Sequence, residues 1–105
     1  MLPVRVLCIF LGMIGEINSA PAYAETIQVT IDKLVISPAE IKAKTGDTVT
    51  WINKDIVAHT ATVRDGFDVM IEANASASVV LKKAGIVEYY CRFHPNMTGR
   101  IVITP

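Results

Sequence analysis

The chain has 105 residues, and its ten basic side chains balance its ten acidic ones, so the formal net charge at neutral pH is zero. This length is enough for one domain. A nucleic-acid interface needs a clustered basic excess, which the sequence lacks, so nucleic acid is excluded as a partner.

The first 24 residues differ in composition from the rest and form a predicted secretory signal. Arg5 gives a short positive start, residues 6–14 are almost entirely apolar, and Ala22-Tyr23-Ala24 places small residues where a signal peptidase cleaves. The apolar run is shorter than the roughly 20 residues that span a bilayer. We therefore expect cleavage after Ala24 and a periplasmic mature domain, residues 25–105, that is monomeric and has no membrane span.

Beyond this signal, apolar and polar residues alternate with the period of a β-strand. Ile27, Val29 and Ile31 alternate with polar residues, and Val49 and Trp51 share one face of a later segment. The segments with strand character are 27–31, 36–41, 48–53, 76–81, 87–91 and 99–104, with turns at 45–47, 65–66 and 83–85. About seven short strands without crossover helices predict an all-β antiparallel sandwich or barrel. A plain β-sandwich binding module without a metal also fits this strand pattern.

The number of cysteines limits which covalent bonds the mature domain can form. Cys8 lies in the predicted signal, so Cys91 is the one thiol of the mature domain, and no intramolecular disulfide can form there. A lone thiol in an oxidising compartment is a liability unless something occupies it.

This thiol belongs to a group of scarce residue types. Cys91, His94 and Met97 follow one another in the segment CRFHPNM, and His59 is the only other histidine. A thiolate and two imidazoles form a trigonal set to which a thioether adds a weak axial contact, and this set suits copper in both of its oxidation states. Because loops cluster at the ends of a sandwich, we expect His59 to reach the others from a second loop. We predict one copper ion held by these four side chains.

Each residue also has an ordinary structural explanation. Taken alone, Cys91 fits a small buried apolar residue, Met97 fits core filling, and His59 fits a surface or core histidine. Zinc binds cysteine and histidine too, but a closed zinc site needs four strong donors and rarely uses methionine. A Cys-His hydrolase needs an orienting group and an oxyanion hole, of which the sequence gives no sign. Copper enzymes with several metal centres need more histidines, so we expect no enzyme activity.

Two segments resemble the cupredoxin family, and most closely the amicyanins. Residues 45–53 (TGDTVTWIN) followed by His59 resemble the strand that leads to the first histidine ligand, and residues 89–102 (YYCRFHPNMTGRIV) resemble the closing hairpin with Cys-x-x-His-x-x-Met. The resemblance implies a Greek-key β-sandwich with type 1 copper, in which His59, Cys91 and His94 are equatorial ligands and Met97 is the axial ligand.

The resemblance also implies a function. It indicates a periplasmic electron shuttle whose donor is methylamine dehydrogenase and whose acceptor is a c-type cytochrome. A periplasmic copper carrier or buffer would use the same ligands and is the alternative.

Three positions depart from the family pattern. Thr60 stands where the family commonly has an asparagine that ties the two ligand loops together, and Ala58 stands where it often has proline. Phe93 occupies another position where amicyanins often carry proline. Unlike proline, Phe93 has a backbone N–H, which we expect to donate to the Cys91 sulfur and to favour the reduced metal.

The ring edge of His94 is expected at the surface, because this residue lies on the predicted ligand loop. An apolar rim around it would let a partner dock closely and exclude water. The residues expected in this rim are Phe93, Pro95, Ile56, Val57, Ala58 and Met70.

Overall fold

The computed structural model describes residues 23–105, so residues 1–22, which contain most of the predicted signal, lie outside the described part. All regular elements between residues 23 and 105 are strands. In this part of the chain, no helix is long and apolar enough to cross a membrane.

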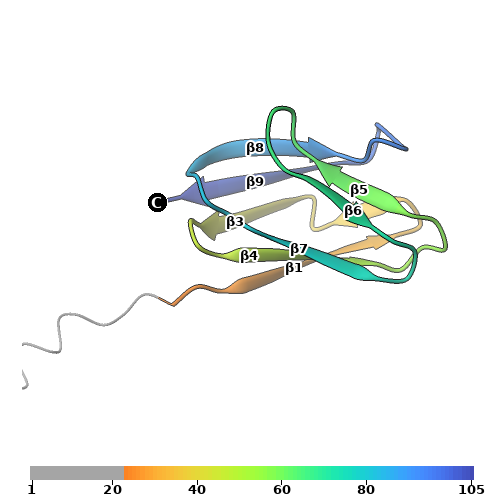
Figure 1. The fold of residues 1–105 in the computed structure, drawn as a ribbon, viewed down its shortest axis with the longest axis horizontal. Coiled ribbons are helices and arrows are strands. Elements are labelled where there is room, and N and C mark those ends of the chain that lie inside the picture. The colour runs from red at the N-terminus through yellow and green to blue at the C-terminus, as the bar shows by residue number, and fades with distance from the viewer. Residues whose placement is uncertain (1–22) are drawn as a thin grey trace, which may run out of the picture.

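Nine strands form two sheets that pack face to face (Figure 1). One sheet has the strand order β2-β1-β4-β7, and the other has the order β3-β9-β8-β5-β6. The predicted all-β sandwich is confirmed, with more strands than expected. In chain order the strands are β1 (Thr26–Asp32), β2 (Val35–Ser37), β3 (Glu40–Lys44), β4 (Thr48–Asn53), β5 (His59–Thr62), β6 (Asp68–Ile71), β7 (Ser76–Val80), β8 (Gly85–Tyr90) and β9 (Thr98–Thr104).

The sheets are not purely antiparallel, which corrects the expectation from the sequence. β1 pairs with β4 in parallel, and β3 pairs with β9 in parallel, whereas the other pairs are antiparallel. Parallel neighbours need a long crossover connection. Between β1 and β4 that connection contains β2, which pairs with β1, and then β3 of the opposite sheet, rather than a helix. The chain thus passes back and forth between the sheets, as in the Greek-key sandwich that the resemblance implies.

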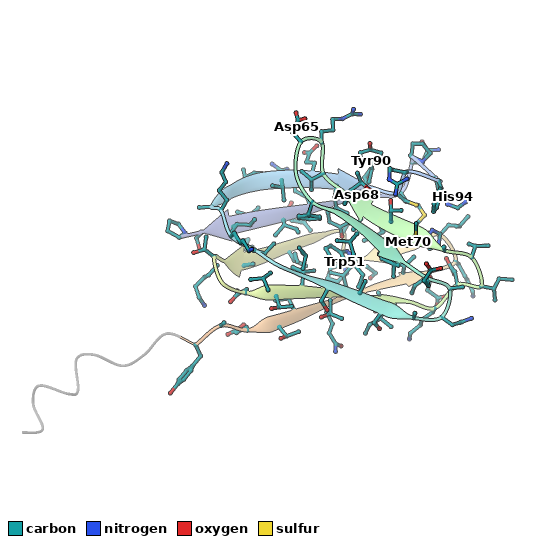
Figure 2. All side chains as sticks on the ribbon, in the orientation of Figure 1. Trp51, Asp65, Asp68, Met70, Tyr90 and His94 are labelled. Carbon is teal, nitrogen blue, oxygen red and sulfur yellow. The ribbon has the colours of Figure 1, made fainter. Side chains whose placement is uncertain are left out.

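The core lies between the sheets and is built from the apolar residues of the alternating strands. In β4, Val49 and Trp51 are fully buried, and the alternate residues Thr48, Thr50 and Ile52 are half-buried. The Trp51 ring centroid lies 5.4 Å from that of Tyr89 and 5.9 Å from that of Phe67, and Figure 2 shows Trp51 between the two sheets. Because successive side chains of a strand point to opposite faces, the sequence alternation places Trp51 in the core.

Two strands, β5 and β6, were not predicted from the sequence. All four residues of β5 are buried, and its sequence HTAT does not alternate between apolar and polar. A strand that is covered on both faces gives no signal with a period of two. As a result His59, which we expected in a loop, is the first residue of a strand.

The candidate ligands gather at one end of the sandwich. The connection between β4 and β5 and the connection between β8 and β9 lie at the end away from the C-terminus (Figure 1). The end of a sandwich is where loops from different strands can bring distant residues together.

Candidate metal centre

Three of the four predicted ligands meet at this end. Cys91 Sγ lies 3.6 Å from Nδ1 of His59 and 3.9 Å from Nδ1 of His94. All three donor atoms lie within 4.8 Å of one another. His59 comes from β5, while Cys91 and His94 come from the connection between β8 and β9. The fold therefore brings together residues that are more than thirty positions apart in the sequence.

The spacing of the donor atoms fits a single metal ion among them. With metal–sulfur bonds of about 2.3 Å and metal–nitrogen bonds of about 2.0 Å, an ion in a trigonal site separates sulfur from nitrogen by about 3.7 Å. The two separations from Cys91 Sγ, 3.6 Å and 3.9 Å, lie on either side of this value. One thiolate and two imidazoles are the trigonal set typical of copper sites that transfer electrons.

Met97 closes the same connection. Its side chain is 6% exposed and belongs to the hydrophobic core cluster together with Cys91. The Cys91 N–H donates to the Met97 carbonyl at 3.1 Å, and the Met97 N–H donates to the His94 carbonyl at 2.9 Å. A third bond, from the His94 N–H to the Cys91 carbonyl at 3.2 Å, completes the turn. These bonds curl the segment around one point, while the axial role of the Met97 sulfur stays a prediction.

The centre is closed on the inside and open at the tip of the sandwich. His59 and Cys91 are fully buried, whereas His94 is half-buried. Figure 2 shows His94 at the tip of the molecule and Met70 on β6. Of the predicted apolar rim, Ile56, Val57, Met70, Phe93 and Pro95 are exposed and Ala58 is half-buried.

Asp55 fixes the ring of His59. Asp55 Oδ2 lies 2.8 Å from His59 Nε2. An ionised carboxylate can only accept, so Nε2 carries the hydrogen, and Nδ1 of the neutral ring keeps its lone pair free on the side of Cys91. A carboxylate in this position orients a metal-binding imidazole and raises its basicity.

The same carboxylate holds the turn between β1 and β2. The N–H groups of Lys33 and Leu34 donate to Asp55 Oδ1 and Oδ2 at 2.6 Å and 3.0 Å. Both turn residues have positive φ angles, 55° and 65°, which residues other than glycine rarely adopt. Partial burial would by itself raise the pKa of Asp55, but the hydrogen bond from His59 and those from Leu34 and Lys33 outweigh it and lower the pKa. Asp55 is therefore ionised at neutral pH.

Asn53 shapes the connection on which Asp55 lies. Its side chain is buried, and Nδ2 donates to the carbonyls of Val57 at 2.9 Å and Glu72 at 3.1 Å. Its Oδ1 accepts the Asp55 N–H at 2.9 Å. A buried amide with both ends bound is a rigid support, so the separation between Asp55 and His59 is set by the fold.

Thr60 binds the sulfur of the centre. The Thr60 N–H donates to Cys91 Sγ at 3.4 Å. This corrects the expectation that Phe93 would supply the donor, because among residues 23–105 the backbone N–H within hydrogen-bond distance of Sγ is that of Thr60. A hydrogen bond to a ligating sulfur tunes the metal through the ligand.

A chain of hydroxyl groups leads from the ligand loop to the surface. The Arg92 N–H donates to Thr60 Oγ1 at 2.8 Å, Thr60 Oγ1 lies 2.9 Å from Thr62 Oγ1, and the Thr62 hydroxyl donates to Asp68 Oδ1 at 2.7 Å. Because the Asp68 carboxylate can only accept, the Thr62 hydroxyl uses its one hydrogen to bind Asp68. The Thr60 hydroxyl must therefore donate its hydrogen to the Thr62 oxygen. Arg92 Nε closes the ring on the same Oδ1 at 3.1 Å.

This ring ties the two ligand segments together, the role that the family resemblance gives to an asparagine at the position of Thr60. The Thr60 hydroxyl holds the residue directly after Cys91, and its backbone holds the sulfur itself. The hydrogen bond from Thr62 and then the Arg92 guanidinium lower the pKa of Asp68, so the end of the chain is an anion at neutral pH.

The residues that support the ligands were not predicted from the sequence. Asp55 could have been predicted, because it is an acidic residue four positions before His59, a candidate ligand. No local signal points to Thr62 and Asp68, because they meet only through the pairing of β5 with β6.

Comparisons of the sequence with known proteins point to one family. The model of the family described as "Cupredoxin-like domain" matches residues 4–103. Amicyanin-alpha of Methylorubrum extorquens is 29% identical over 99 residues, which cover 88% of this chain and 82% of that protein. Amicyanin of Paracoccus denitrificans is 32% identical over 84 residues, covering 73% of this chain and 64% of that protein. The methylamine utilization protein MauL of M. extorquens is 30% identical over 96 residues, covering 87% and 84%.

Solved structures of amicyanins are similar to this chain. A point mutant of amicyanin in its Cu(I) form has a TM-score of 0.70 at 30% identity, covering 83% of this chain and 87% of that one. Amicyanin from Paracoccus versutus has a TM-score of 0.67 at 26% identity, covering 81% and 85%. The likeness therefore covers most of the chain and is not confined to the ligand segment.

Proposed function

Because the chain belongs to the family of cupredoxin-like domains, we propose that it is a type 1 copper protein that carries single electrons between redox partners. His59, Cys91 and His94 are the proposed equatorial ligands, and Met97 is the proposed axial ligand. The observation that carries the proposal is the convergence of Cys91 Sγ and two histidine nitrogens within 4.8 Å of one another. As an electron carrier, the protein converts no substrate of its own.

Copper in such a donor set supplies one-electron redox chemistry, because the set suits both oxidation states. The role of the protein's own residues is to hold the metal-binding atoms in place. Asp55 orients His59 through its Nε2, and the Thr60 N–H withdraws charge from the Cys91 sulfur. Donors that are fixed by their own hydrogen bonds rearrange little when the charge at the centre changes, and this is what rapid electron transfer requires.

His94 is the proposed route for electrons, because it is the ligand that reaches the surface. Exposed apolar side chains lie on the connections that end at the same tip, with Ile56 85% exposed and Phe93 48% exposed. An apolar rim excludes water from a docked partner, while its small area allows quick release.

The proposed electron donor is methylamine dehydrogenase, and the proposed acceptor is a c-type cytochrome. Support comes from the relatives named amicyanin and from the relative named as a methylamine utilization protein. These partners are proposed to meet the chain in the periplasm, after cleavage of the predicted signal behind Ala24. Stopped-flow mixing with each partner tests the assignment. Failure of either reaction would contradict that partner without contradicting the copper site.

Copper titration followed by visible spectroscopy tests the centre itself. One equivalent should produce an intense thiolate-to-copper band, and Cys91→Ser should abolish it. Met97→Leu should keep the copper but shift the spectrum and the reduction potential, whereas Met70→Leu, a matched change at a methionine that is 43% exposed, should shift neither. A purified protein that stays colourless with cupric salt and unfolds at an unchanged midpoint would contradict the proposal.

A copper carrier would use the same ligands, so the rate of copper exchange separates the two functions. A shuttle should retain its copper against a competing chelator during many redox cycles, and a carrier should release it. The full burial of His59 and Cys91 favours retention.

A further inference from the structure

The residue that would begin the mature chain is already bound to a buried carboxylate. The Glu25 N–H donates to Asp47 Oδ1 at 2.9 Å, and the Glu25 carbonyl accepts the Thr48 N–H at 2.9 Å. Asp47 is only 2% exposed. We propose that Asp47 is the receptor for the amino terminus that cleavage after Ala24 creates, so that processing turns this hydrogen bond into an ion pair.

Asp47 is held so that one oxygen is available for this purpose. Its Oδ2 accepts the Lys44 N–H at 2.8 Å, and its own N–H donates to the Lys44 carbonyl at 3.0 Å, which fixes the turn between β3 and β4. The Asp47 carbonyl accepts the Leu81 N–H at 2.8 Å. The backbone hydrogen bonds from Glu25 and then from Lys44 lower the pKa of Asp47, so the receptor is an anion at neutral pH.

The chemistry of cleavage places a cation at the bound atom. Hydrolysis of the Ala24–Glu25 peptide bond consumes one water: the oxygen goes to the carbonyl carbon of Ala24, and the nitrogen of Glu25 leaves as an amine. The new carboxyl group of Ala24 gives up its proton and becomes a carboxylate. The amine of Glu25 takes up a proton and becomes an ammonium. An ammonium next to a carboxylate forms a stronger, charge-assisted hydrogen bond than a neutral amide does.

The position of the cut decides whether the pair forms. If the chain kept one more residue, the amine would move by about 3.8 Å, the spacing of consecutive Cα atoms, and Glu25 would keep an ordinary amide. That amide form is compatible with folding, because it is the form that the full chain shows.

The other charged groups around this site are few. The side chains of Glu25, Lys42 and Lys44 line the same surface hollow as Asp47, and Lys82 follows Leu81 on the neighbouring connection. Three of the four are lysines, two of them on β3, and the positive charge of Lys44 helps to lower the pKa of Asp47, whereas the Glu25 carboxylate favours the new ammonium.

The pair should leave a signature in the pH dependence of stability. An α-amino group has an ordinary pKa of about 7.7–8.0, and a carboxylate partner raises the pKa in the folded state. The stabilisation is therefore complete below about pH 7.7 and is lost as the pH rises through the folded value. Burial also raises the pKa of Tyr89 above its ordinary 10.0, so Tyr89 affects stability only above a pH window of about 7–9.

The test starts from the full precursor, exported and processed in cells. The mass of the purified protein should show Glu25 as the first residue. Urea unfolding of the metal-free protein between pH 7 and 9 should show a folding constant that falls about tenfold for each unit by which pairing raises the pKa. This fall should be larger than the fall in Asp47→Asn and in a precursor with one alanine inserted after Ala24, whose Glu25 nitrogen is an amide.

Two results would overturn the proposal: a mature chain that begins at another residue, or the same pH dependence with and without the inserted alanine. The variant with the inserted residue keeps a Glu25 amide, the form that the full chain shows bound to Asp47, so it is expected to fold. The measurement needs no copper, so its failure would not bear on the proposed function.

Discussion

The Oδ2 atom of Asp55 lies 2.8 Å from the Nε2 atom of His59, and the same carboxylate binds the N–H groups of Lys33 and Leu34. His59 belongs to the five-stranded sheet, whereas the turn at Lys33 and Leu34 joins two strands of the four-stranded sheet. One carboxylate therefore orients a candidate ligand of one sheet and closes a turn of the other. The shape of the centre depends on correct assembly of the whole sandwich.

We expect Asp55→Asn to weaken copper binding by about 10- to 100-fold, the usual cost of losing a partner that orients a histidine ligand. The neutral amide no longer attracts the hydrogen of His59 Nε2 as a carboxylate does. Competition titration against a chelator measures the change. Asp65→Asn is the matched control, because Asp65 lies in an exposed turn at a φ of 58° that asparagine tolerates. Equal affinities in the two variants would refute the role of Asp55.

We expect Thr62→Val to speed the release of copper to a chelator by about fivefold, which corresponds to one net hydrogen bond. Valine keeps the shape of threonine but removes the acceptor of the Thr60 hydroxyl, which then no longer has a fixed direction. Thr62→Ser should behave like the original protein. Thr50→Val serves as the control. It breaks an exposed hydroxyl pair between Thr50 and Ser78, which both lie on the four-stranded sheet, away from Thr62. A similar release rate for both valine variants would count against the hydroxyl chain.

We expect Phe93→Ser to lower the rate constant for electron transfer with a c-type cytochrome several-fold while the visible spectrum stays the same. The substitution removes apolar contact area beside His94, and a few well-placed apolar side chains carry most of the energy of such an interface. Ile86→Ser is the control, since Ile86 is also exposed, at 58%, but lies at the far end of β8. If both variants reacted at the original rate, the rim would not be the docking surface.

We expect Gly99→Ala to reduce the free energy of unfolding by about 1–3 kcal/mol, as overpacking usually does. Gly99 pairs with Tyr89 across β8 and β9, and a Cβ atom at Gly99 would overlap the Tyr89 ring. Urea unfolding measures the loss. In the background of Tyr89→Ala, the same substitution should cost almost nothing. An equal cost in both backgrounds would show that the clash is not the cause.

Acid should destabilise the protein partly through Asp47. Its pKa in the folded state lies below the ordinary value of 3.8, so its contribution is present above pH 3.8 and is lost as the pH falls through the folded value. Asp47→Asn should therefore flatten the fall in the unfolding midpoint below about pH 4, where the carboxylate begins to take up its proton in the unfolded chain. Asp65→Asn should leave the slope as it was, and a slope unchanged in Asp47→Asn would contradict the prediction.

The local pattern of the sequence was sufficient for much of the fold and for the candidate ligands. The alternation in β4 places Trp51 in the core, because strand geometry alone sends every second side chain to one face. His59, Cys91, His94 and Met97 could be selected because cysteine, histidine and methionine are scarce in this chain. Scarcity and spacing are properties of the chain itself, and they need no knowledge of contacts.

The tertiary structure alone decided how the centre is supported. Asp55, Thr62 and Asp68 are common polar residues whose roles arise from pairing between strands and between sheets. The donor to the Cys91 sulfur turned out to be Thr60, thirty-one positions away, rather than the nearby Phe93. Hydrogen bonds of this kind depend on where distant segments meet, and the local periodicity of a sequence carries no record of that.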